Sequence, residues 1–115
     1  MSARASPVYQ PVTNQSAINF STSGDNIILS SFPGRQIKVY RLKLICAGAT
    51  SITVKDGVGI VLDGPLAFGA GGGMVLDWTS LDMPPWYETS IGNALVINSS
   101  LAVQVGGSLD YITGL

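Results

Sequence analysis

The sequence predicts an all-β protein, an antiparallel β-sandwich of the jelly-roll kind with an extended N-terminal arm. From Ser16 onward, apolar runs of four to eight residues are separated by Gly, Pro, Asn or Asp every eight to twelve residues, as in sandwiches and barrels. No segment repeats its apolar residues at helical spacing over three turns. The strand candidates number about eight to ten, which suits two packed sheets.

The arm is predicted over residues 1–14. This stretch contains Pro7 and Pro11, has no apolar periodicity and is rich in small polar residues. Proline drives the residue before it toward extended backbone, and a terminus without an apolar face does not join a core. The chain has 115 residues, enough for one domain and not for two. A single sandwich domain is therefore predicted over residues 15–115.

The first predicted strand, residues 17–21, has apolar side chains at alternate positions. A turn at 24–26 is expected to lead into a second strand at 27–29. The next turn is predicted at 33–34, where Pro precedes Gly, because Pro suits the second position of a β-turn and Gly accepts positive φ at the third.

The longest predicted strand covers residues 36–47. Its apolar residues occupy odd positions up to Val39 and even positions from Leu42 onward. Because side chains alternate between the two faces of a strand, the inward face must change between Tyr40 and Arg41. We therefore predict a β-bulge or a crossing between sheets at this point.

The second half of the domain predicts further short strands and turns. Asp56-Gly57 is a strong hairpin signal, and Asp63-Gly64-Pro65 is expected to close that hairpin unit. The glycine tract at 69–73 predicts a loop, or a place where another backbone comes close. Strands are predicted at 51–55, 58–62, 74–78, 86–89, 94–98, 101–105 and 108–113, with a break at 82–85 and a turn at 92–93, and residues 66–68 are a further short candidate.

The chain is unusually poor in charge. Hydrophobic residues make up 46% and charged residues 11%, and six basic and seven acidic residues give a net charge of −1, with a pI near 4.9. Six dispersed basic residues cannot form the dense positive surface that phosphates require, so nucleic acid is not expected as a partner. A surface with so few charges predicts that the protein is packed against another macromolecule.

No membrane partner is expected. No window approaches 18 consecutive apolar residues, and the N-terminus lacks the apolar core of a signal peptide. Synthesis in the cytoplasm is therefore predicted, with retention there unless the protein is exported by another route.

No catalytic constellation is recognisable, and no cofactor or metal is predicted. The chain has no histidine and one cysteine, Cys46, in an apolar strand, so a buried hydrophobe is favoured over a nucleophile. The glycine tract lacks the Lys and Ser or Thr of a phosphate-binding loop. A hydrolase whose carboxylates are brought together by folding remains an alternative, with Asp56, Asp63, Asp77, Asp82 and Glu88 as its candidates.

The aromatic residues Trp78, Trp86 and Tyr87 lie on both sides of Pro84-Pro85. They are expected either to fill the core and subunit contacts or to form a flat platform for sugar rings, and the first is favoured. The low surface charge is best explained by assembly, since exposed strand edges and apolar patches must be covered.

Over residues 17–113 the sequence resembles small β-sandwich virion structural proteins of tailed bacteriophages and prophages, of which capsid decoration (cement) proteins are the comparison class. The segments that carry the resemblance are 24–26 with the strand after it, 33–47, 52–55, 62–66, the glycine tract, 86–89, and 94–107.

The resemblance implies a non-enzymatic protein that binds the assembled phage head as a homotrimer and stabilises contacts between capsomers. Its partners are then other copies of the chain and the major capsid protein, and it is made in the host cytoplasm and located on the capsid surface. A carbohydrate- or receptor-binding module of a tail or head fibre is the alternative. The expected subunit or capsid contacts are Pro7, Pro11, Trp78, Pro84, Pro85, Trp86 and Tyr87.

Overall fold

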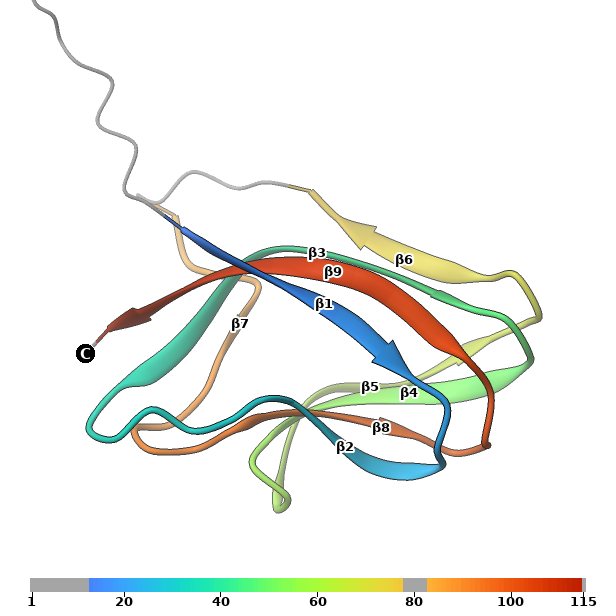
Figure 1. Ribbon diagram of the computed structural model, residues 1–115, viewed down its shortest axis with the longest axis horizontal. Helices are drawn as coiled ribbons and strands as arrows, with labels where there is room; N and C mark the ends of the chain where they lie inside the picture. Colours follow the sequence, from blue (N-terminus) through green and yellow to red (C-terminus); the bar gives the residue numbers. More distant parts are fainter. Residues whose placement is uncertain (1–12, 78–82, 115) are drawn as a thin grey trace, which may run out of the picture.

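The computed structural model describes residues 13–77 and 83–114, which contain nine strands and no helix. The strands form two packed antiparallel sheets (Figure 1). In the first, sheet A, the order is β1 (Asn14–Phe20), β9 (Val105–Gly114), β3 (Gln36–Cys46) and β6 (Gly73–Leu76), and β7 (Tyr87–Glu88) also pairs with β3. In the second, sheet B, the order is β2 (Gly24–Leu29), β8 (Leu95–Ser99), β4 (Thr50–Asp56) and β5 (Ile60–Phe68).

The core lies between the two sheets and is built from alternate side chains of each strand. Burying these side chains removes apolar surface from water, which is the main favourable contribution to folding. The predicted all-β antiparallel sandwich is confirmed. The fully buried aliphatic residues of this core are Ile18, Ile37, Val39, Leu42, Leu44, Ile52, Val54, Leu95, Ile97, Val105 and Leu109.

The predicted change of face in the long strand is confirmed as a β-bulge. The register of β3 against β9 shifts between Val39 and Arg41, so Tyr40 is the extra residue. β3 stays in sheet A along its whole length, and a crossing between sheets does not occur. The bulge keeps both Val39 and Leu42 inward and turns Arg41 outward, because an inserted residue resets the alternation.

Two predicted turns are present. At Pro33-Gly34 the amide of Arg35 donates to the carbonyl oxygen of Phe32 at 3.0 Å, and Gly34 has a φ of 70°, as the Pro-Gly turn requires. After β4, Gly57 reverses the chain with a φ of 64°. The loop is one residue longer than a two-residue turn and the return strand, β5, begins at Ile60 instead of residue 58.

Two predicted breaks are wrong because the chain continues as strand through them. The predicted turn at 24–26 lies within β2, where Asp25 pairs with Asn98, and the chain reverses before Gly24. Asp63-Gly64-Pro65 does not close the hairpin unit, since β5 continues to Phe68. Pro65 is tolerated there because it lies at a register shift of an edge strand, where neither Gly64 nor Pro65 is paired with a residue of β4.

The predicted strand at 101–105 is also wrong. Residues 101–104 form a loop and β9 begins at Val105. The predicted strand at 74–78 is β6, which ends at Leu76. At the N-terminus, β1 begins at Asn14, inside the predicted arm, whereas residues 1–12 lie outside the described part of the chain.

Glycine permits β3 to be closely flanked on both sides. A Cβ atom on Gly107 of β9 would overlap the carbonyl oxygen of Lys43, and one on Gly73 of β6 would overlap that of Leu44. The prediction that the glycine tract marks a close backbone approach is therefore confirmed at Gly73. At Gly106, by contrast, the nearest atom to an added Cβ is 4.0 Å away.

We predict that Gly107→Ala lowers the free energy of unfolding by about 1–3 kcal/mol, because the methyl group forces β9 away from β3. Gly106→Ala, one residue away, is the matched control and should change stability by less than about 1 kcal/mol. Chemical unfolding of the three proteins measures both effects. Equal stability of the two variants would contradict the close approach.

Candidate functional site

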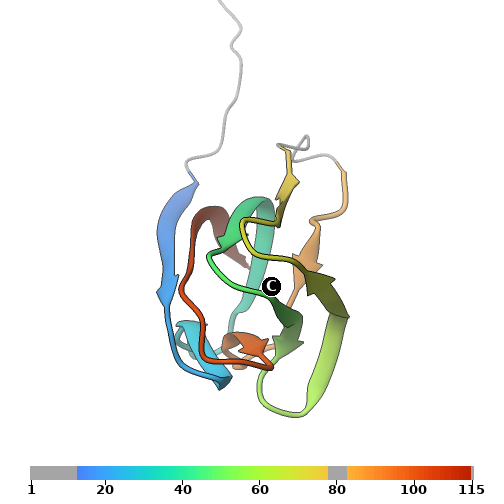
Figure 2. The same cartoon turned by 90° about the vertical axis from the view of Figure 1, so that its right-hand side faces the viewer.

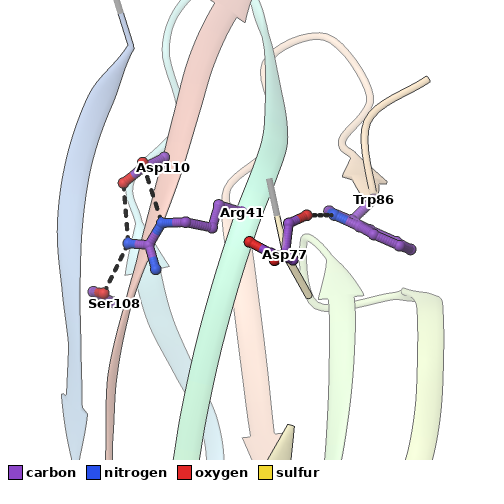
Figure 3. Close-up of polar contacts among 5 residues, drawn as sticks. All are labelled: Arg41, Asp77, Trp86, Ser108 and Asp110. Atoms are coloured by element: carbon purple, nitrogen blue, oxygen red, sulfur yellow. Dashed lines mark hydrogen bonds and ion pairs between the residues drawn. The ribbon is translucent and has the colours of Figure 1, made fainter. Parts of the chain in front are cut away.

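Trp86 presents a fixed aromatic ring at the surface of sheet A. Its side chain is 47% exposed, and the indole Nε1 donates to the backbone oxygen of Asp77 at 2.8 Å (Figure 3). Its backbone amide donates to the carbonyl oxygen of Val39 at 2.8 Å. Because both the indole nitrogen and the main chain of Trp86 are hydrogen-bonded, the exposed part of its ring is a rigid apolar surface. Tryptophans of this kind often anchor interfaces.

Tyr87, the next residue, belongs to the core. It is 7% exposed, and its hydroxyl donates to Oδ2 of Asp63 at 2.7 Å. Burial and the neighbouring Asp63 carboxylate both raise the pKa of Tyr87. Since Tyr87 comes from sheet A and Asp63 from sheet B, this hydrogen bond ties the two sheets together.

The structure brings together some of the residues expected at contacts. Pro84 is exposed and Pro85 half-buried, and with the exposed Met83 they lead directly into Trp86 beside β3. Pro7, Pro11 and Trp78 lie outside the described residues. Of the predicted contact residues within the described chain, Pro84, Pro85 and Trp86 therefore lie in one stretch at the surface, next to Met83, whereas Tyr87 is buried.

A salt bridge that sequence reasoning missed lies on the outer face of sheet A. Arg41, turned outward by the bulge, donates from Nε and Nη2 to the two carboxylate oxygens of Asp110, at 3.2 Å in each case, and from Nη2 to Oγ of Ser108 at 3.0 Å (Figure 3). Strand pairing places Arg41 beside Asp110. The bidentate geometry fixes the guanidinium, so this pair supports the bulge.

Asp56 is the most buried of the candidate carboxylates that the structure describes. It is 4% exposed and accepts hydrogen bonds from the amide of Ser90 at 3.0 Å, the hydroxyl of Ser90 at 2.7 Å and Nδ2 of Asn93 at 3.0 Å. Burial by itself raises the pKa of Asp56, but the hydrogen bonds outweigh it and the pKa lies below its usual value. The carboxylate thus fastens the end of β4 to the loop before β8.

Two of the other candidate carboxylates also have structural contacts, and a third residue, Asp77, holds the Trp86 indole through its backbone oxygen. Asp63 accepts from Tyr87, and Glu88 lies 3.7 Å from Nζ of Lys38. Asp82 lies outside the described residues. Within the residues that the structure describes, no group of three or more His, Cys, Asp or Glu side chains is placed to hold a metal ion.

Cys46 is buried, and burial raises the pKa of its thiol, as expected of a core residue. Among the described residues there is also no helix with the length and apolar character needed to cross a membrane.

The β4–β5 hairpin carries apolar side chains outside the core. Val58 is 72% and Val61 56% exposed, and the hairpin projects from sheet B in both views (Figures 1 and 2). Strand register places Val61 in one row with Lys55, Val96 and Ile27 across the outer face of sheet B. Exposed large apolar residues occur on both sheets and in the loops: Ile27, Ile45, Val58, Ile60, Val61, Val75, Met83, Trp86, Ile91 and Leu101.

A shallow, mainly apolar groove of about 430 Å³ lies at the Cys46 end of β3. Ile45, 61% exposed, forms part of its lining, and glycines of β9 leave it open because they carry no side chain. The lining residues are Lys43, Leu44, Ile45, Ala47, Gln104, Gly106 and Gly107. The groove offers apolar contact and few polar groups, which suits binding better than acid–base chemistry.

A scan against protein-family models, a search of curated proteins and a search of solved structures each found no match for this chain.

Asp56 should make the stability of the fold decrease at acid pH. Its pKa is lowered in the folded protein, so its contribution is present above the unfolded value of about 3.9 and is lost as pH falls through the folded value. We predict that Asp56→Asn lowers the free energy of unfolding at pH 7 by about 1–3 kcal/mol. The free energy of unfolding of the variant should also decrease less than that of the wild type as the pH is lowered. Chemical unfolding at a series of pH values measures both.

The control is Asp25→Asn. The pKa of Asp25 is also lowered, by Asn98 and Lys55, but this carboxylate is exposed, so its variant should alter the pH dependence less. An Asp56→Asn protein with the wild-type pH dependence would contradict the role assigned to Asp56.

Proposed function

We propose that this protein is a non-enzymatic structural component of a bacteriophage virion: a capsid decoration (cement) protein that binds the assembled head as a homotrimer and stabilises contacts between capsomers. Its partners are then its own copies and the major capsid protein, and its location is the capsid surface. The observation that carries this proposal is the number of large apolar residues that are exposed in the described part of the folded chain.

Ten large apolar side chains are exposed in the described part of the chain, whereas charged residues make up only 11% of the sequence. Large exposed apolar side chains are favourable contacts once they are covered by a partner, and depletion of charge is typical of the centres of interfaces. A rigid sandwich with its polar core groups hydrogen-bonded can carry such surfaces without a catalytic centre. These properties fit a protein present in many copies in an assembly.

The strand order supports the jelly-roll form of the proposal. The order β1-β9-β3-β6 in one sheet packs against β2-β8-β4-β5 in the other. Successive strands therefore alternate between the sheets from β1 to β4. In the second half of the chain, β5 and β8 lie in sheet B and β6, β7 and β9 lie in sheet A. Two interleaved sheets of four main strands are typical of jelly rolls, which occur in many viral capsid proteins.

Stabilisation of the shell follows from mass action. A protein that contacts neighbouring capsomers only when they are assembled shifts the equilibrium toward the assembled shell. Repetition of the contact over many sites makes the total effect large even if each contact is modest. Trp86 with Pro84 and Pro85 is the contact surface we assign within the described residues, and Pro7 and Pro11 in the N-terminal segment are assigned to the capsid.

A carbohydrate- or receptor-binding module is the second candidate, and Trp86 is the observation that favours it. Its indole ring is exposed and held in place by Asp77, and flat aromatic surfaces bind the apolar faces of sugars. A glycan array separates the candidates, since a decoration protein should bind empty capsids and not sugars.

We predict a native mass of three times 12.0 kDa by light scattering after gel filtration. Trp86→Ala should shift the trimer toward monomer by about 2 kcal/mol, as loss of an anchor residue does. Leu101→Ala, also an exposed apolar residue, is the control and should leave the mass unchanged. A wild-type monomer would count against the homotrimer, and a Trp86→Ala trimer of unaltered stability would count against this contact surface.

Deletion of residues 1–12, which precede β1, should abolish binding to purified capsids. The shortened protein should still form a trimer. The physical reason is that a terminal segment with two prolines and no apolar periodicity can contribute contacts that form only on binding. Co-sedimentation with empty capsids measures the effect. Full capsid binding by the shortened chain would show that the segment is not a capsid contact.

A further inference from the structure

The two sheets expose four edges, and three of them are blunted against pairing with another strand. β5 contains Pro65 and two register shifts, and β2 carries the charged Asp25 and one register shift. The edge beyond β3 is divided between β6 and β7, of four and two residues. Proline, charge, bulges and short length are the devices by which proteins prevent edge-to-edge association.

β1 has none of these devices. All seven of its residues, Asn14–Phe20, pair with β9 without a register shift, and none is proline or charged. Among the described residues β1 pairs with β9 alone, and Figure 2 shows it along one side of the sandwich. Alternate backbone amide and carbonyl groups of an edge strand point away from its neighbour, so β1 offers a regular row of hydrogen-bonding groups.

The sequence of β1 is complementary to itself. A two-fold axis through Ala17 places Gln15 opposite Asn19 of the second copy, and it pairs all seven residues of the strand. The outward side chains of Gln15, Ala17 and Asn19 are exposed and uncharged, so no like charges meet. Side-chain amides that face each other across a strand pair can exchange hydrogen bonds, and such pairs stabilise sheets.

We propose that two copies of this chain associate through antiparallel pairing of their β1 strands about a two-fold axis at Ala17, which joins their A sheets into one continuous sheet. This contact goes beyond the proposed function and does not depend on it. It is isologous, so it doubles whatever unit the chain forms: a monomer becomes a dimer, and a trimer becomes a pair of trimers. On a decorated surface it would link neighbouring copies directly.

Disulfide cross-linking tests the register. Directly opposite residues in an antiparallel pair have Cα atoms about 4.5–5.5 Å apart, within the range that a disulfide spans. With oxidised glutathione as oxidant, Ala17→Cys should therefore form a covalent dimer. Gln15→Cys is the matched control: the two Gln15 positions are offset by four residues along the strands, about 14 Å, which a disulfide cannot span. The native Cys46 is buried.

Charge variants test the contact in solution. Wild-type protein should show a concentration-dependent doubling of its smallest mass in sedimentation velocity. Gln15→Lys with Asn19→Lys places lysines opposite each other and should weaken the doubling about tenfold, more at low salt than at high salt. Gln15→Lys with Asn19→Glu places a lysine opposite a glutamate and should restore the doubling of mass. Because the same two positions are substituted in both variants, the difference between them reports the charge pairing.

The outcomes distinguish this contact from the proposed function. A mass that never doubles, or equal cross-linking of Ala17→Cys and Gln15→Cys, would overturn β1 pairing, whatever the smallest species is. Doubling that the lysine pair leaves unaffected would assign the association to another surface and would also overturn it. Capsid binding and the mass of the smallest species test the proposed function separately.

Discussion

The placement of β3 between its neighbours is the constraint on which the rest of the structure depends. β3 pairs with β9 on one side and with β6 and β7 on the other, and its inward side chains are buried in the core. Both flanks come so close that Gly107 and Gly73 leave no room for a side chain. The bulge at Tyr40 lets the two halves of β3 face the same core, so one irregular residue keeps sheet A continuous and the core closed.

Polar groups inside the sandwich are used for fastening. The three hydrogen bonds to Asp56 and the Tyr87–Asp63 contact satisfy groups whose burial would otherwise be costly. On the outside, Arg41 and Asp110 pair beside the bulge. The hydrogen-bonded carboxylates Asp56, Asp63 and Asp110 thus stabilise the fold. The exposed apolar residues lie outside the core.

The sequence predicted the sandwich, the Pro33-Gly34 turn and the change of face at Tyr40, because each depends on residues near one another in the chain. It misplaced the strand ends at 24–26 and 63–65, where residues typical of turns are accommodated inside edge strands. It could not identify the Asp56 contacts with Ser90 and Asn93, which join positions more than thirty residues apart. The predicted aromatic group is also divided: successive residues of extended backbone point to opposite faces, so Trp86, just before β7, is exposed and Tyr87, its first residue, is buried.

By itself, the sequence determined that the chain forms about eight to ten short strands and that few charges are left for the surface. Periodicity and turn chemistry are local, so they can be read without knowing which strands are neighbours. Only the tertiary structure decided the strand order, the partners of the buried carboxylates, the glycines that must stay small and the edge that is left open at β1. These depend on which distant segments meet, and that is set by packing two sheets around one core, a property of the whole chain.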